Sequence, residues 1–271
     1  MKQLLLTFFS LLQIISTQAN DLPFQVGEEL KFDIHYKYGL LMLKAGTANK
    51  KIIGSNIDNI NSYYTSLDFK TTSFFDKIYK MRDTLSSHIS ENIQPIFHSR
   101  SINEGSYHFK EELFFNKFSK NYSEVRIKRE SREVLKFDTI LTSNNFGYDL
   151  LSVIHYVRLL DYSKMASPVN NISIFFGKKN IKLTIRNEGQ SVVEKSETLK
   201  YNTYKIAVDF TDEVFNESKN AIEIWMSDDE NRVPVKMRAK LSIGVAEAIL
   251  VSYNNLKHPF KSEIKIPVRK N

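Results

Sequence analysis

The 271-residue chain contains no cysteine. This absence excludes disulfides, thiolate metal ligands and a lipid attached to a cysteine side chain. A chain without disulfides must rely on its hydrophobic core, and about 250 residues bury enough surface for one. The composition agrees, because 42% hydrophobic and 25% charged residues are typical of a soluble globular protein.

Motifs for catalysis or metal binding are also missing. The sequence has no HExxH, GxSxG, glycine-rich phosphate-loop or EF-hand pattern. Its six histidines show no short metal-ligand spacing, so we interpret them as surface or satisfied core residues. We therefore predict no metal, no cofactor and no catalytic residue.

No apolar run is long enough to cross a bilayer, which takes about 20 residues. The run at 4–15 is shorter and contains three polar residues. It follows Lys2 and precedes small residues that end at Ala19, which is typical of a secretory signal peptide. We predict a cleavable signal peptide at 1–19 and a periplasmic or secreted mature chain that is not a lipoprotein. The alternative is an N-terminal core segment.

Charge of one sign is not strongly in excess. Loss of Lys2 with the signal peptide leaves 37 basic and 31 acidic residues, a net charge of +6. The densest basic stretch, 126–136, is interleaved with Glu130 and Glu133. We interpret it as a solvated strand face and turn, and a surface for anionic lipid or polysaccharide is the alternative. Export argues against nucleic acid as a partner.

Apolar and polar residues alternate with a period of two in many segments, most clearly at 28–36, 204–210, 222–226 and 233–241. This period predicts half-buried antiparallel strands. Turn signals separate the segments, and neither a linker nor an internal repeat divides them. We predict a single all-β, mainly antiparallel domain over 20–271, a large curled sheet or barrel-like meander.

One segment has the helical period instead. Apolar residues at 150, 153, 154, 157 and 160 share one helix face, and Asp149 lies where a carboxylate suits the helix dipole. We predict one inserted amphipathic helix at about 148–161, which plugs one end of the barrel or lies across the concave face.

Glycines and paired aromatic residues complete the pattern. Gly46 and Gly244 lie among small residues in strand patterns and predict bends or close backbone approach. Three Phe-Phe pairs, at 74–75, 114–115 and 175–176, would put one ring on each sheet face. We interpret them as core and edge packing, with an apolar groove for a lipid-like ligand as the alternative.

Three stretches resemble a known family: VGEELKFDIHYKYGLLMLKAGTA (26–48), YDLLSVIHYVRLL (148–160) and IEIWMSDDENRVPVKMRAKLSIGVAEAIL (222–250). They are similar to the exported bacterial proteins of domain of unknown function 3108. In the third stretch Trp225, Ser227, Asp228, Asp229, Arg232, Pro234 and Val235 keep the family's order. The resemblance implies an exported β-rich architecture and brings no activity, cofactor or catalytic residue.

The candidate binding residues are Asp149, Arg158, Trp225, Asp228, Asp229 and Arg232. The two adjacent aspartates predict either a hairpin turn braced by an arginine or a cation or acid/base site. Asp149 and Arg158 predict a helix-start charge and a helix-to-sheet ion pair, or a polar site at a cavity mouth. Trp225 is interpreted as a packing anchor.

The favoured function is non-enzymatic binding of a hydrophobic, lipid-like ligand or a cell-envelope component. The alternatives are an envelope-acting hydrolase that uses carboxylates such as Asp228 or Asp229, and a purely structural envelope protein. Carboxylates that converge with a histidine or arginine in a pocket would favour the enzyme, and an apolar cavity would favour the carrier.

Overall fold

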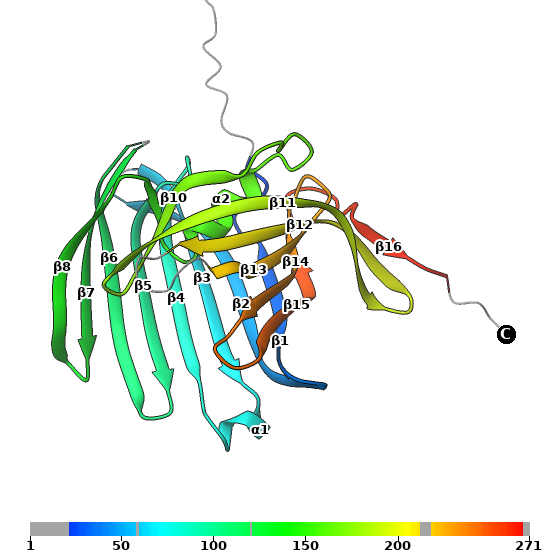
Figure 1. The fold of residues 1–271 in the computed structure, drawn as a ribbon, viewed down its shortest axis with the longest axis horizontal. Helices are drawn as coiled ribbons and strands as arrows, with labels where there is room; N and C mark the ends of the chain where they lie inside the picture. Colours follow the sequence, from blue (N-terminus) through cyan, green and yellow to red (C-terminus); the bar gives the residue numbers. More distant parts are fainter. Residues whose placement is uncertain (1–21, 58–59, 120, 212–217, 268–271) are drawn as a thin grey trace, which may run out of the picture.

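The computed structural model describes residues 22–57, 60–119, 121–211 and 218–267. The predicted signal peptide lies outside the described residues. In the first half of the chain, consecutive strands pair with one another as antiparallel hairpins (Figure 1). These strands are β1 (Glu29–Tyr38), β2 (Leu41–Ile57), β3 (Ile60–Thr71), β4 (Arg82–Ser90), β5 (Pro95–Glu104), β6 (Tyr107–Ser119), β7 (Tyr122–Ser131) and β8 (Val134–Ser143).

The second half repeats this arrangement and joins the first through one long-range pairing. Its strands are β9 (Phe146–Tyr148), β10 (Val169–Phe176), β11 (Lys179–Ser196), β12 (Leu199–Thr211), β13 (Ser218–Ser227), β14 (Pro234–Lys240), β15 (Val245–Asn254) and β16 (Glu263–Lys265). Strand β1 pairs antiparallel with β15, so the sheet order runs from β8 down to β1 and then from β15 down to β9. Among the described strands, only β9 and β10 pair in parallel. The predicted mainly antiparallel, barrel-like sheet is confirmed.

The two edges of the sheet approach each other, so that the sheet nearly closes into a barrel (Figure 1). The backbone N–H of Gly147 in β9 donates to Ser123 Oγ in β7 at 2.7 Å, and Ser143 Oγ donates to Ser173 Oγ at 3.1 Å. A Cβ at position 147 would lie 2.3 Å from the Phe175 ring. Glycine therefore permits the close approach, and side chains rather than a strand ladder make the contact.

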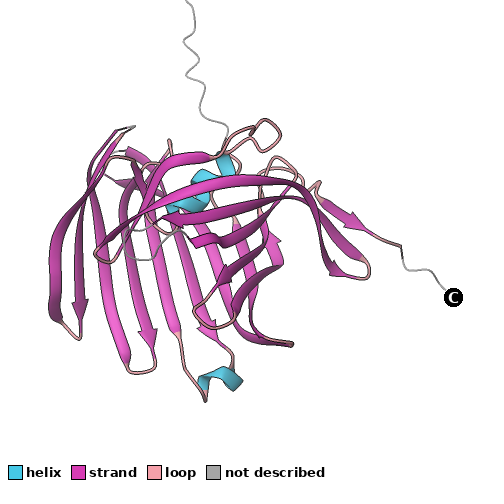
Figure 2. Cartoon of the chain, viewed as in Figure 1, coloured by secondary structure: helices cyan, strands magenta, loops and turns pink. Residues whose placement is uncertain are grey.

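Two short helices are present in the described residues, α1 (Ser73–Asp76) and α2 (Ser152–Leu159) (Figure 2). Helix α2 is shorter than the predicted 148–161. It starts later because residues up to Tyr148 pair with β10, and it ends early because Leu160 is extended, with ψ 133°. Phe74 and Phe75 lie in helix α1, so this pair does not place one ring on each face of a sheet as predicted. Neither helix is long and apolar enough to cross a membrane.

Helix α2 packs into the concave side of the sheet. Val157 is buried in a cluster with residues of β10 to β13, such as Ile206 and Ile224, and Leu150, Val153 and Leu160 pack against the same cluster. A second cluster joins Leu30 and Phe32 of β1 to the C-terminal strands. The face of the helix that the sequence predicts to be apolar is therefore occupied by contacts with the sheet.

Several local predictions need correction. The sequence pattern predicts two strands, at 181–186 and 190–195, where the structure has the single strand β11. It predicts no strand at 134–143, where β8 lies with most of its side chains exposed. Gly244 lies in the β14–β15 turn rather than in a strand, with φ +75°. Both glycines do mark a close backbone approach, since a Cβ would lie 2.5 Å from the Lys70 carbonyl oxygen at position 46 and 2.6 Å from the Lys37 carbonyl oxygen at position 244.

Candidate functional site

The start of α2 is held by the carboxylate of Asp149, which is completely buried. It accepts hydrogen bonds from the backbone N–H groups of Leu151 and Ser152 at 2.8 and 3.0 Å, and from Ser87 Oγ at 2.7 Å. His98 Nδ1 lies 3.2 Å away. Burial raises the pKa of Asp149, but His98 and the hydrogen bonds outweigh it and leave the pKa below its ordinary value. The residue thus joins α2 to β4 and β5.

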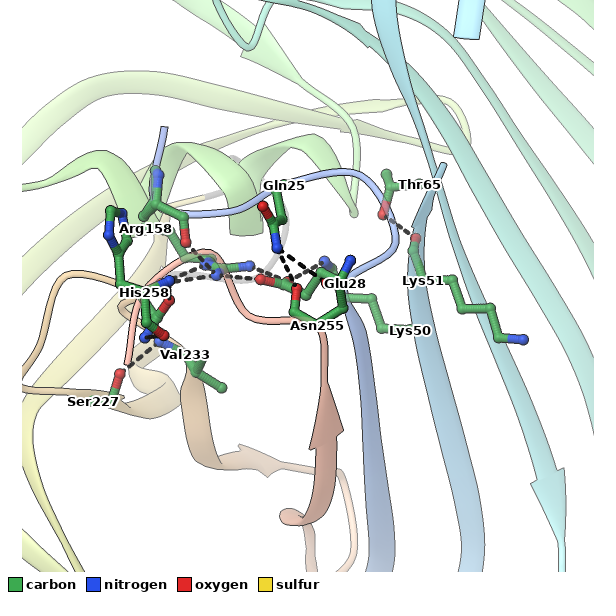
Figure 3. A network of polar contacts seen from close by, with 12 residues as sticks. Gln25, Glu28, Lys50, Lys51, Thr65, Arg158, Ser227, Val233, Asn255 and His258 are labelled. Atoms are coloured by element: carbon green, nitrogen blue, oxygen red, sulfur yellow. Dashed lines mark hydrogen bonds and ion pairs between the residues drawn. The ribbon is translucent and has the colours of Figure 1, made fainter. Parts of the chain in front are cut away.

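The end of α2 is held by Arg158, whose side chain is also completely buried (Figure 3). Its guanidinium donates to both carboxylate oxygens of Glu28, at 2.6 and 2.8 Å. It also donates to the backbone carbonyls of Pro23 at 2.9 Å and Asn231 at 2.8 Å. One side chain therefore connects the helix, the N-terminal segment and the β13–β14 turn through a bidentate ion pair and two carbonyls.

A second cation, Lys50, faces the same carboxylate. Its Nζ lies 3.8 Å from Glu28 Oε1 and has no hydrogen-bond partner within the described residues. Burial lowers the pKa of Lys50 to about 8, although Glu28 partly opposes the change. Burial raises the pKa of Glu28, but Arg158 and Lys50 reverse this and lower it.

His155 completes this buried group. Neither of its ring nitrogens has a hydrogen-bond partner within the described part of the chain, and its ring packs 4.6 Å from that of Phe24. Burial, together with the charges of Lys50 and Arg158, lowers the pKa of His155 well below its usual value, so the ring is neutral near pH 7. The group then consists of one carboxylate, two cations and a neutral imidazole, all shielded from solvent.

The β13–β14 turn carries three of the predicted residues. Asp229 Oδ1 accepts from Ser227 Oγ at 2.9 Å and from the Asn231 N–H at 3.1 Å, and its Oδ2 accepts from the Ser262 N–H at 3.1 Å. The Arg232 guanidinium does not reach the aspartate carboxylates. It donates to the carbonyls of Arg158 and Leu159 at 3.2 and 3.0 Å and so caps the C-terminus of α2.

A hollow of about 300 Å³ lies above this turn, lined by Asp228, Asp229 and Arg232 together with residues such as Asp161 and Lys261. Asp228 is exposed and accepts from Gln190 Nε2 at 3.2 Å. Within the described residues, no group of three or more His, Asp or Glu side chains is placed to hold a metal ion. The hollow is polar, small and open to solvent.

The structure therefore brings Arg158, Asp229 and Arg232 into one network, with Asn231 between them. The Asn231 side chain, fully buried, donates to the carbonyls of His258 and Pro259 and accepts from the His258 N–H. Asp149 lies at the other end of α2. Trp225 stands apart, with its ring between the cross-strand partners Lys205 and Lys236, whose Nζ atoms are 5.5 and 5.2 Å from its ring.

Sequence reasoning missed Glu28, Lys50, His155 and Asn231. The alternation of inward and outward residues along the strands contains a signal for Lys50 and Glu28. Lys50 continues the inward series of Ala48 and Ile52, and Glu28 continues that of Leu30. A charged residue in an otherwise apolar series predicts a buried ion pair.

The turns at the end of the barrel opposite α2 (Figure 1) carry exposed apolar side chains. Thirteen apolar side chains on its turns are each at least 44% exposed, and we call this set the apolar end. The β1–β2 hairpin contributes five of them: Tyr38, Leu40, Leu41, Met42 and Leu43. The other four connections contribute Phe74, Ile78, Tyr79, Tyr107, Val134, Leu135, Leu241 and Ile243.

Hydrogen bonds link the turns of the apolar end to one another. Tyr36 Oη donates to the Ile243 carbonyl at 3.1 Å, and the Thr72 N–H donates to the Ala45 carbonyl at 2.9 Å. Farther along, the Gly105 N–H donates to the Lys80 carbonyl at 2.8 Å, and Arg132 Nη2 donates to the Ser106 carbonyl at 3.2 Å. The five connections therefore form one continuous rim.

A second hollow, of about 620 Å³, lies across β1 to β4 and is lined by side chains of both charges. Its lining includes Lys31, Asp33, Asn49, Asp68, Lys70, Arg82 and Thr84. Ion pairs such as Lys44 to Asp33, at 2.7 Å, lie beside it. Phe32, Ala48, Phe69 and Val251 also line this hollow, so it combines charged side chains with apolar ones.

One solved structure of similar fold supports the barrel-like architecture. A crystal structure of a beta-barrel-like protein of domain of unknown function DUF1849 from Brucella abortus has a TM-score of 0.57 and 10% sequence identity. That likeness covers 86% of this chain and 98% of the other. A Bacteroides fragilis protein with a YmcC-like fold has a TM-score of 0.36 and 6% identity, with the same shares covered.

None of the curated proteins compared with the chain matches it. The family model described as protein of unknown function (DUF3108) matches residues 31–251. Because that match covers most of this chain, the chain belongs to the DUF3108 family.

Proposed function

We propose that the protein is an exported, non-enzymatic binding protein that holds a hydrophobic component of the cell envelope through its apolar end. The observation that carries this proposal is the continuous rim of thirteen exposed apolar side chains on five linked turns. Soluble proteins rarely leave such a patch uncovered, and larger ones mark sites of interaction. The concave face beneath α2 is occupied by the helix, which favours the apolar end as the binding surface.

The polar residues support binding rather than catalysis. Asp149 and Arg158 are fully buried and hydrogen-bonded, and both oxygens of Asp229 accept hydrogen bonds within the turn. Their contacts join chain segments that are far apart in the sequence. We assign them to the stability of the scaffold that carries the apolar end.

Binding is tested with a fluorescent fatty acid as the probe. We expect micromolar affinity for the purified mature protein. Combining Leu40→Ser with Leu41→Ser should weaken it by at least about tenfold, because burying one leucine side chain contributes roughly 1.5–3 kcal/mol. The control combines Ile140→Ser with Val192→Ser, two apolar positions outside the apolar end that are 56% and 53% exposed.

An unchanged affinity in the Leu40/Leu41 variant would refute the assignment of the site. Export is tested separately by N-terminal sequencing of protein from the native host. We expect a start at or near Asn20, because Lys2, the apolar run and Ala19 have the order of a signal peptide. Recovery of Met1 would refute processing.

A further inference from the structure

We infer that the partner of the apolar end is the surface of an anionic phospholipid bilayer, into which the rim of turns inserts. This inference rests on the proposed function and names the partner. It depends on two independent features of the rim: the placement of its apolar side chains and the charge of the residues beside them.

The first feature is shape. The exposed apolar side chains stand on five separate connections, and the most prominent, Leu40, is fully exposed at the tip of the β1–β2 hairpin. Neither of the two hollows described above is lined by residues of the apolar end. A row of separate tips can contact an extended layer along its whole length, whereas one small molecule would cover only a few of the tips. Tyr38, Tyr79 and Tyr107 add aromatic side chains, which favour the boundary between lipid and water.

The second feature is charge, because basic residues flank the apolar tips. Lys37 and Lys44 bracket the β1–β2 tip, although Lys44 also pairs with Asp33 at 2.7 Å. Lys77 precedes Ile78 and Lys80 follows Tyr79. Arg132 and Lys136 bracket Val134 and Leu135, and Lys240 precedes Leu241.

Across the five connections (37–44, 72–81, 104–107, 132–136 and 240–244) there are seven basic and three acidic residues, a local net charge of +4. Long basic side chains placed just behind apolar tips reach phosphate groups while the tips enter the acyl layer.

Charge also decides between partners. A second copy docked end to end would bring +4 against +4, with two sets of lysines facing each other. A bilayer that contains anionic phospholipid supplies both the apolar layer and the opposite charge. The bilayer therefore accounts for both features of the rim.

The test is flotation of the mature protein with vesicles of phosphatidylcholine alone or with about one third phosphatidylglycerol, at low and at physiological salt. We expect at least about tenfold stronger partition into the anionic vesicles, weakened by salt. Leu40→Ser combined with Leu41→Ser should abolish flotation, and Lys77→Gln combined with Lys80→Gln should lower partition about tenfold. Ile140→Ser combined with Val192→Ser is the control and should float like the unmodified protein.

Orientation has its own readout, because the chain has a single tryptophan. In a Trp225→Phe background, Leu40→Trp should show a blue-shifted emission when anionic vesicles are added, and Ile140→Trp should not. Equal shifts at both positions would overturn the proposed orientation.

The fatty-acid assay distinguishes failure of the bilayer inference from failure of the proposed function. Fatty-acid binding that depends on Leu40 and Leu41, without flotation, would overturn the bilayer inference and leave the proposed function standing. Loss of both would refute both. A dimer in solution that Leu40→Ser with Leu41→Ser dissociates would overturn the inference in favour of a second copy.

Discussion

Lys50→Met should stabilise the protein, although it removes a residue from the buried network. A lysine whose pKa falls from 10.5 to about 8 on folding has its charged form destabilised by roughly 3 kcal/mol. Its Nζ makes no hydrogen bond within the described residues and lies 3.8 Å from Glu28, which Arg158 already neutralises with two hydrogen bonds. We expect the variant to be more stable than the unmodified protein by about 1–3 kcal/mol at pH 7.

The same residue predicts a pH dependence. Between pH 8 and about 10.4, Lys50 is deprotonated in the folded chain but protonated in the unfolded chain. The unfolded state then binds more protons, so the free energy of unfolding rises with pH in this window. Lys50→Met should remove that rise. The pH scan should stop near pH 10, because burial raises the pKa of Tyr201 from 10.0 to about 12 in the folded chain. Above pH 10 this tyrosine loses its proton in the unfolded chain first, so the free energy of unfolding falls for a reason unrelated to Lys50.

The assay is urea denaturation followed by circular dichroism at several pH values from 7 to about 10. Lys51→Met is the matched control, since Lys51 is the next residue and its side chain is 47% exposed. It should change stability by less than about 0.5 kcal/mol. A Lys50→Met variant that is less stable by several kcal/mol, with an unchanged pH profile, would refute the reasoning and show that the lysine charge supports the network.

Three further predictions concern the same scaffold. Arg158→Met leaves Glu28 without its bidentate partner and should destabilise the protein by about 3–5 kcal/mol in urea denaturation; a change below about 1 kcal/mol would contradict this. Asn231→Ala removes the side chain that holds the C-terminal segment and should cost about 2–4 kcal/mol, with faster amide exchange in that segment; unchanged exchange would count against it. Gly46→Ala should destabilise the protein by about 2–3 kcal/mol, because the new Cβ would lie 2.5 Å from a carbonyl oxygen. Gly54→Ala is the control and should be near neutral, because its Cβ would have no neighbour closer than 3.4 Å. Equal melting temperatures of the two variants would contradict the steric argument.

The period of two was sufficient to predict most of the sheet, because the buried and exposed faces of a half-buried antiparallel strand appear as alternating apolar and polar residues. Strand β8 escaped prediction for the same reason. It lies at the edge of the sheet, where most of its side chains meet water and the alternation is weak. The start of α2 could not be placed, because the pairing of Tyr148 with β10 competes with the helical period.

The candidate site was harder to predict because it is made by contacts between distant segments. Arg158 was recognised, but its partner Glu28 lies 130 residues away and nothing local connects them. The apolar end had a local signal that was not used. Leu40 follows Gly39 at the tip of a hairpin, where the residues are usually polar. An apolar residue at such a position is exposed without packing in the core, and so indicates a surface that contacts something else.

The pairing of β1 with β15 has a consequence for synthesis of the chain. Apart from β16, which pairs with β12, neighbouring strands elsewhere in the sheet are close in sequence and can pair as soon as they are made, whereas Glu29 lies opposite Asn254. Until β15 leaves the ribosome, one edge of β1 has no partner and is a template for pairing with another chain. We expect a chain that stops at Gly244 to aggregate more steeply with concentration during refolding than the full chain, and equal refolding yields would contradict this. A strand made near the end of the chain, β15, therefore limits how safely the first strands can fold.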